Sequence, residues 1–311
     1  MTSGLSLWII STKIIDPEMT MAYLPYVYTS PYDPARTDDG LFGPGSVTWR
    51  IMTSRIMWVA VVRALYLQAL HPRVIRGTLQ NAPALTEPVD AWARLRRTRR
   101  FIETRTFGTT AEAERAGRLV RKVHEPLTGT DPDGTSYRVD DPGLLLWVHC
   151  GEVASCADIA QRSGLPFSAA DLDAFVAEQR ISAELIGVDP AMAPASMAEL
   201  GAYYERMKPV LYACDEAKQA LRLTFRPPVP DGNRALKLGL PPVSALAFAT
   251  LPRWARQLYG RPDGPLSDMA ATAGLRAARL AFDRQWLFRP AMRAVHRAET
   301  AGDAHLPPPL T

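Results

Sequence analysis

From about Ser46 onward, apolar residues recur at spacings of three and four, the period of an amphipathic α-helix. The pattern predicts helices over 46–71, 88–107, 110–127, 141–163, 169–187, 197–220, 243–259 and 267–297. The segments between them are rich in Gly, Pro and Asp, which is typical of turns. Only the short SYRV segment at 136–139 is compatible with a strand, and strands do not alternate with helices. The sequence therefore predicts an all-α fold.

Four of these helices carry a recognisable start. Three begin at a hydroxyl side chain with an acidic residue three positions later, which is the spacing of a capping box. These pairs are Thr109 with Glu112, Ser168 with Asp171, and Ser196 with Glu199. The fourth start combines Asp141 as a cap with Pro142, because proline suits the first position of a helix.

The same pattern divides the chain into three parts. Residues 1–45 are rich in Pro, Gly, Tyr and Asp and are predicted to form an irregular N-terminal arm. Residues 46–300 are predicted to form one multi-helix domain, in which the Pro-rich segment at 225–233 is a loop. Residues 301–311 are predicted to be a disordered tail.

Composition excludes several classes of protein. The 36 Lys and Arg residues exceed the 32 Asp and Glu residues by a net charge of +4, which is too small an excess to indicate nucleic-acid binding. No apolar stretch is expected to reach the length of a membrane span, and the start of the chain lacks the basic segment of a secretory signal. The motifs of serine hydrolases, P-loop proteins, dinucleotide-binding folds and zinc proteases are absent from the sequence.

The cysteines add to this picture. Cys150, Cys156 and Cys214 have neither the spacing of a zinc site nor that of a redox pair. They are interpreted as small core residues of a protein in a reducing compartment, and a cytoplasmic location is expected. No feature of the sequence predicts an oligomeric state.

Histidine is a scarce candidate for chemistry, with five occurrences in 311 residues. His71, His124 and His149 lie in predicted helices, whereas His296 and His305 lie near a polar end and are interpreted as ordinary. Neutral imidazole is a ligand for iron and other transition metals, so a histidine inside an apolar helical interior could hold a metal or haem. Each also has a structural alternative: a helix cap for His71, a structural neighbour of an arginine for His124, and a hydrogen-bonded core residue for His149.

Arginines accompany one of these histidines. Arg94, Arg97 and Thr98 share one face of a predicted helix, which suits them to an anionic group such as the propionates of a cofactor. The alternative is a solvated, arginine-rich helix. Arg121 precedes His124 by three positions and lies on the same face, where it could neutralise a cofactor carboxylate.

The helix beginning at Pro142 carries a second pattern. Leu145, His149, Glu152 and Cys156 fall on one stripe, and the His-x-x-Glu spacing could contribute to a metal site. A carboxylate-bridged di-iron bundle would need several repeats of that unit, and the sequence has none.

Five segments in order resemble a known family. They are LQALHPRVIRG, RLRRTRRFIETRTFGTTAEAE, VRKVHEPLTG, YRVDDPGLLLWVHCGEVAS and LPRWARQLYG. Together they resemble the bacterial branch of the oxygenase family that includes latex-clearing proteins (rubber oxygenases) and the MpaB-type enzymes of mycophenolic acid biosynthesis. The resemblance covers about residues 45–260.

The resemblance implies a globin-like helical fold that holds a b-type haem, with His124 as the iron ligand. It implies that Arg121 and Arg94 orient the haem or pair with its propionates and that Thr98 packs beside it. Arg97 stands where rubber oxygenases have a lysine that can occupy the distal position of the iron. Because arginine stays protonated, Arg97 is not expected to coordinate iron.

The resemblance further implies oxygen-dependent attack on a carbon–carbon double bond of a lipophilic, isoprenoid-like substrate, with molecular oxygen as co-substrate. His149, with His71, is expected to position oxygen or accept a proton. Relatives carry a His-Ser pair where this chain has Asn81 and Ala82. Two alternatives stay open: a non-catalytic haem-binding or sensor protein, and a cofactor-free helical interaction protein. A basic amphipathic stretch at 275–298 could also contact a membrane surface, or could be an ordinary packed helix.

Overall fold

The computed structural model describes residues 36–82, 88–225, 234–261 and 264–286. The first helices are α3 (Val47–Met52), α4 (Met57–Gln68), α5 (Pro72–Asn81), α6 (Pro88–Phe107) and α7 (Thr110–His124). A hairpin of β1 (Thr128–Thr130) and β2 (Ser136–Arg138) follows. The remaining helices are α8 (Pro142–Arg162), α9 (Ala169–Leu185), α10 (Met197–Met207), α11 (Asp215–Phe225), α12 (Arg234–Ala249), α13 (Arg253–Leu258) and α14 (Pro265–Trp286), with a short 3-10 turn at Lys208–Val210. The all-α prediction is confirmed.

The hairpin confirms the short strand expected at SYRV. Its two strands pair antiparallel, with Gly129 opposite Tyr137. A Cβ atom at Gly129 would overlap the ring of Tyr137, so only glycine lets this ring lie across the neighbouring strand.

Three predicted helices are interrupted in the structure. The segment 46–71 divides into α3 and α4 because the chain leaves the helix at Thr53, whose hydroxyl donates to the Arg50 carbonyl. The segment 197–220 divides at the 3-10 turn that contains Pro209. The predicted helix 243–259 divides at Pro252, where α13 begins a new helix.

Prolines also accompany one missed helix and one error of length. Pro72 ends the preceding helix, as its position suggests, but it also starts α5 as the first helical residue, which the sequence reading overlooked. Conversely, Pro241 and Pro242 lie inside α12, which starts at Arg234, earlier than predicted.

The predicted helix starts are mostly reproduced. Thr109 and Ser168 both form complete capping boxes. Ser196 accepts from the Glu199 amide, but the Glu199 carboxylate accepts from the Ala195 amide instead of closing the box. Asp141 accepts from two backbone amides at the start of α8, as expected.

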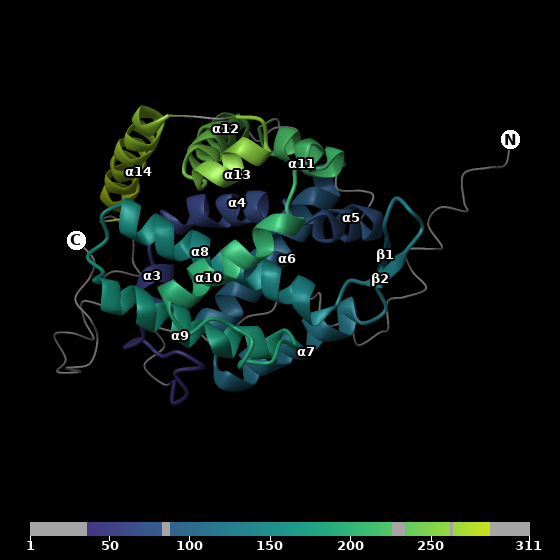
Figure 1. The fold of residues 1–311 in the computed structure, drawn as a ribbon. Helices are drawn as coiled ribbons and strands as arrows, with labels where there is room; N and C mark the ends of the chain where they lie inside the picture. The colour runs from purple at the N-terminus through teal and green to yellow at the C-terminus, as the bar shows by residue number, and fades with distance from the viewer. Residues whose placement is uncertain (1–35, 83–87, 226–233, 262–263, 287–311) are drawn as a thin grey trace, which may run out of the picture.

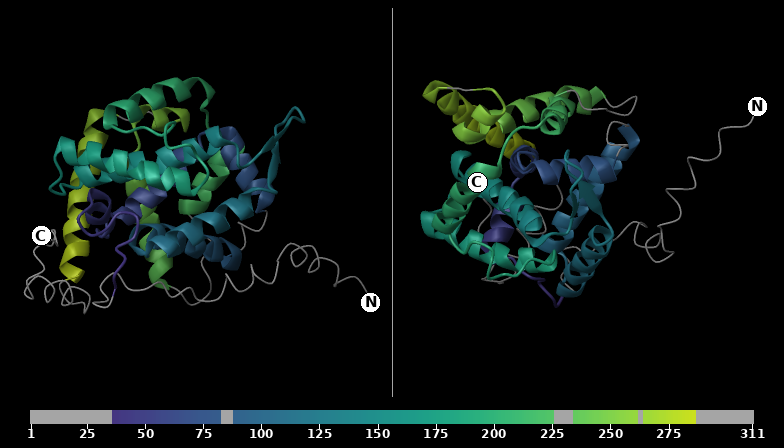
Figure 2. Two further views of the ribbon diagram at one scale, coloured as in Figure 1. Left: turned by 90° about the horizontal axis from the view of Figure 1, so that it is seen from below. Right: turned by 45° about the vertical axis from the view of Figure 1, so that its right-hand side comes forward.

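The core is built around α8. Figure 1 shows α7 and α9 at the lower edge of the molecule and α11 to α13 at the top, with α4 and α8 between them. α8 packs mainly against α4 and also against α9, and Trp147 on α8 is fully buried. The close approach of α8 to α4 requires Gly151, where a Cβ atom would come within 3.0 Å of the Gln68 side chain. Figure 2 shows α14 along one end of this bundle.

α8 corrects one expectation. It is long and apolar enough to cross a membrane by length and composition, although the sequence reading expected no such stretch. In the structure 72% of its most apolar window is buried inside the protein, and core helices pass the same test.

The described end of the N-terminal arm, residues 36–45, is irregular and lies against the start of α7. The Asp38 carboxylate accepts from the backbone amide and the hydroxyl of Thr110. The left-handed backbone of Gly40 passes so close to Gly108 that a Cβ atom would overlap the Gly108 carbonyl. The predictions for residues 1–35 and for the tail 301–311, and both C-terminal histidines, lie outside the described residues.

Candidate functional site

The three internal histidines come from three different helices. His71 immediately precedes α5, His124 is the last residue of α7, and His149 lies two turns into α8. Among the described residues, the Nδ1 atoms of His71 and His124 are buried without a hydrogen-bond partner. Because buried polar atoms are normally paired, these unpaired nitrogens are candidates for a function that the folded chain alone does not satisfy.

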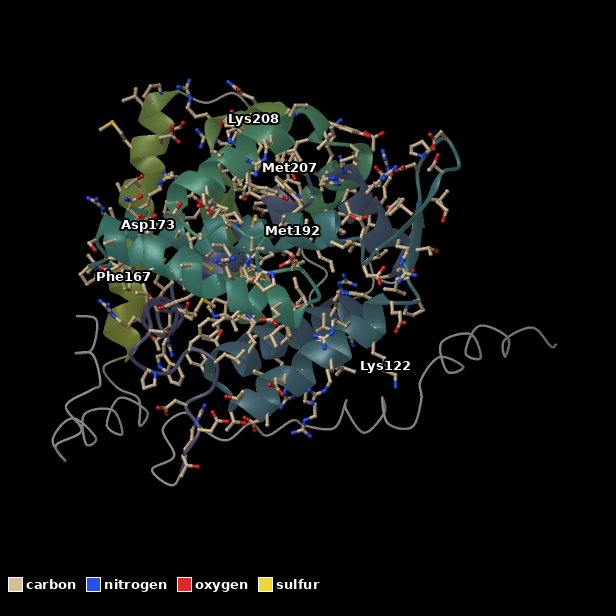
Figure 3. All side chains as sticks on the ribbon, turned by 60° about the horizontal axis from the view of Figure 1, so that its bottom comes forward. Lys122, Phe167, Asp173, Met192, Met207 and Lys208 are labelled. Carbon is tan, nitrogen blue, oxygen red and sulfur yellow. The ribbon has the colours of Figure 1, made fainter. Side chains whose placement is uncertain are left out.

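His124 is half-buried at the end of α7. Burial lowers the pKa of this imidazole, the positive charge of Arg94 lowers it further, and Asp140 opposes both effects. The ring is therefore neutral at pH 7, which is the form of histidine that binds a metal. Figure 3 shows α7 at the surface, with Lys122 extending from the turn that leads to His124.

Arg94 lies on α6, which packs against α7. Its side chain has an exposed surface, yet desolvation by surrounding protein lowers its pKa, and the charge of Arg97 adds to this shift. Arg97 and Thr98 are also exposed. The structure thus brings Arg94 within electrostatic range of His124. For the exposed Arg97 and Thr98, the interpretation as a solvated helix face fits as well as the interpretation as a cofactor site.

Arg121 has a structural partner. Its guanidinium donates to the Leu185 carbonyl at the C-terminal end of α9, and its stem lies against Gly187. Arg121 and His124 line the same pocket of about 430 Å³ at the protein surface, where Arg138 and Asp140 form an ion pair. The predicted shared face of Arg121 and His124 is therefore present, with the Arg121 charge placed against a helix terminus.

A family model described as "ER-bound oxygenase mpaB/B'/Rubber oxygenase, catalytic domain" matches residues 49–283. This range covers most of the chain and includes every residue discussed above. The chain belongs to this oxygenase family. Comparison with curated proteins found no significant match, and comparison with solved structures found none either.

Within this MpaB and rubber oxygenase fold, His149 is the most deeply buried of the three histidines. Burial lowers its pKa to about 3, with a smaller contribution from the charge of Arg105. Arg105 is itself buried and forms an ion pair with Glu152, one turn after His149. The Glu152 carboxylate is therefore engaged by Arg105, and this ion pair does not support a metal site formed by His149 and Glu152. Nothing in the spacing of the sequence marks Arg105, although it lies over the Phe101 ring one turn earlier in α6.

His71 occupies the N-cap position of α5, but its side chain does not cap the helix, since it makes no capping hydrogen bond. Its ring centroid lies 6.3 Å from that of Trp147, and burial together with the charge of Arg73 lowers its pKa. Asn81 donates to the carbonyls of Gly77 and Thr128 and so ties the end of α5 to β1.

The remaining candidates are structural. The three cysteines are free and buried, as predicted, and burial raises the pKa of the Cys150 thiol to about 12. Within the described ranges, no group of three or more His, Cys, Asp or Glu side chains is arranged to hold a metal ion. A b-type haem asks less of the protein, since the porphyrin supplies four ligands and one neutral imidazole is enough to attach it. The unpaired Nδ1 of His124, its neutral ring and the desolvated Arg94 nearby fit such a group.

Proposed function

We propose that this family member is a haem b-dependent oxygenase that attacks a carbon–carbon double bond in a lipophilic small molecule. The single observation that carries the proposal is His124, an imidazole kept neutral by burial and by Arg94, with a buried ring nitrogen that has no partner in the protein. The family match supports the oxygenase class. When bound, the haem would supply an iron centre for the activation of molecular oxygen.

In this proposal His124 holds the iron, and its lowered pKa keeps the ring available below the pH at which an ordinary histidine becomes protonated. Arg94 is the best candidate to pair with a haem propionate. A guanidinium that is already desolvated gains more from a carboxylate partner than one in bulk water. Arg121 supports the site by fixing the end of α7 against the end of α9.

His149 and His71 would line the reacting side. A general base that works near pH 7 has a pKa near 7, and the pKa of about 3 makes His149 far too weak a base for that task. Its neutral ring still has one donor and one acceptor nitrogen, so it is suited to orient oxygen or a polar substrate group by hydrogen bonding. The role of proton acceptor that the sequence suggested for it is therefore not part of the proposal.

The low pKa of His149 also favours a second candidate function. Because His149 does not take up a proton near neutral pH, a haem pocket that contains it would also suit a non-catalytic haem-binding or sensor protein. Consumption of oxygen with an alkene substrate separates the two, since only the oxygenase turns over. We further propose a reducing compartment, because the three cysteines are unpaired, and contact with a membrane surface as a source of lipophilic substrate.

The test is the visible absorption spectrum of the protein expressed with a supply of haem. We expect a Soret band in the wild type, its loss in a His124→Ala variant, and its retention in a matched His71→Ala variant. A wild type that stays colourless after haem is added would contradict the cofactor. A Soret band that is indifferent to His124 would contradict the ligand assignment.

A further inference from the structure

A large cavity among the described residues lies away from the three histidines. It has a volume of about 1030 Å³, opens to the surface, and is bordered by α4, α8, α10, α13 and α14. Ala154, Asp158 and Arg162 contribute one stripe of α8 to its wall. At about 100° per residue, His149 lies roughly 140° to 180° around the helix from Ala154 and Asp158. α8 therefore separates this α8–α14 cavity from the candidate haem site.

Most of the inner surface of the α8–α14 cavity is apolar. Leu200, Tyr204, Trp254 and Met269 all line it. The Tyr204 and Trp254 rings lie with their centroids 5.9 Å apart. The Tyr204 hydroxyl donates to the Cys150 carbonyl, 3.2 Å away inside the core. With its hydroxyl used there, Tyr204 offers the cavity the carbon face of its ring.

Two arginines at the base of the cavity share one carboxylate. Asp158 lies 3.2 Å from Arg63 and 3.7 Å from Arg162. Arg63 is buried and also donates to the Thr250 carbonyl and the Ser155 hydroxyl. Both guanidinium groups are held by hydrogen bonds to the protein, so this base is a fixed polar surface.

Two further carboxylates of the lining also have cationic partners. Glu205 pairs with Lys208, which lies one turn later at the surface. Asp268 pairs with the fully buried Arg256. Every acidic side chain that lines the cavity is therefore matched by a cation.

The rim carries positive charge that is not matched. Arg253 is exposed and has no ion-pair or hydrogen-bond partner for its side chain among the described residues. Arg276 donates only to the Arg162 carbonyl, at a long 3.4 Å. The cavity thus has an apolar interior with two guanidinium groups available at its mouth.

We propose that the α8–α14 cavity binds an amphipathic organic anion, a carboxylate with a long apolar chain. The chain would lie over Leu200, Trp254 and Met269, and the carboxylate would pair with Arg253 and Arg276. Guanidinium groups match carboxylates in geometry and charge, and an apolar pocket with a few placed polar groups is the usual form of a small-molecule site. This site is separate from the proposed haem site and does not depend on it.

The test is calorimetric titration of the full chain with decanoate and, separately, with its methyl ester. We expect decanoate to bind and the uncharged ester to bind at least about tenfold more weakly. The Arg253→Gln/Arg276→Gln double variant should weaken decanoate at least about tenfold and leave the ester unchanged. The Trp254→Ala variant should weaken both ligands, because it removes part of the apolar wall.

Two controls locate the binding. Arg261→Gln removes an exposed arginine that follows α13 but does not line the cavity, and decanoate should bind this variant as it binds the wild type. His124→Ala should also leave decanoate binding unchanged. The proposal is overturned if decanoate does not bind, if the double variant binds it as well as the wild type, or if the His124 variant loses it.

Discussion

Two regions of this molecule differ in how the nitrogens of selected buried side chains are paired. Around α4, α12 and α13, Arg63 uses all three of its guanidinium nitrogens on Thr250, Ser155 and Asp158. Around α5 and α7, the Nδ1 atoms of His71 and His124 are buried without a hydrogen-bond partner among the described residues. Hydrogen-bonded buried groups stabilise the folded state, whereas buried groups without a partner are candidates for binding a ligand. The arginine side should therefore govern unfolding, and the histidine side should govern cofactor binding.

The largest expected effect is the loss of haem affinity on replacement of His124, on the histidine side of the molecule. In a His124→Ala variant we expect haem affinity to fall by more than about 100-fold, because changes that only support a metal ligand already cost 10- to 100-fold. The midpoint of thermal unfolding without haem should change little, because the buried Nδ1 atom of this ring has no hydrogen-bond partner among the described residues. Haem titration and calorimetry check the two expectations, and a large loss of stability without a loss of affinity would reverse the comparison.

The next effect comes from the arginine side. The Arg256 guanidinium donates to the Ala249 and Leu251 carbonyls and pairs with Asp268. An Arg256→Met variant leaves these acceptors without their donor, which should lower the free energy of unfolding by about 3 kcal/mol. Denaturant unfolding measures this loss. The haem spectrum of the variant that remains folded should match that of the wild type, and a shifted Soret band would count against the separation.

His149 makes the free energy of unfolding depend on pH. Its pKa is about 3 in the folded protein against 6.5 as its ordinary value, so the folded state favours the neutral ring. Its contribution to stability is complete above pH 6.5 and is lost as the pH falls from 6.5 toward 3, at up to about 1.4 kcal/mol per pH unit.

The check compares unfolding free energies of the wild type and a His149→Phe variant across that window. The slope of the wild type should exceed that of the variant, which cannot take up this proton. Parallel pH dependences would show that His149 titrates normally in the folded protein.

The smallest effect concerns the cap that starts α7. Thr109 and Glu112 close a capping box, and a Thr109→Ala change should cost about 1 kcal/mol of stability. Because His124 lies at the other end of this helix, haem affinity should change less than twofold. Thr135→Ala, an exposed turn residue, serves as the matched control. A loss of haem affinity as large as that of His124→Ala would mean that the site depends on the whole helix.

The sequence was informative where local chemistry decides the outcome. The helical period, the caps at Thr109, Ser168 and Asp141, and the short strand at 136–138 all follow from neighbouring residues, and the structure reproduces them. The sequence was less informative at Pro72, because a proline that ends one helix is also a good first residue for the next.

In the candidate site, too, contacts between distant segments of the chain could not be predicted from local sequence. Arg94 on α6 acts electrostatically on His124 on α7, and only the family resemblance suggested that these two residues belong to one site. The ion pair of Arg105 with Glu152 spans 47 positions of the chain, and no periodicity indicates it. The α8–α14 cavity draws its lining from α4 to α14, so no single segment of the sequence carries its pattern.

The most direct test of the central claim is chemical rescue of the iron ligand. A His124→Gly variant removes the imidazole and leaves space at the end of α7 for a free imidazole molecule. The account predicts that haem added to this variant gives a disturbed Soret band and that added imidazole restores the band of the wild type. If the variant already shows the wild-type band, or if imidazole has no effect on it, His124 is not the ligand of a haem in this protein.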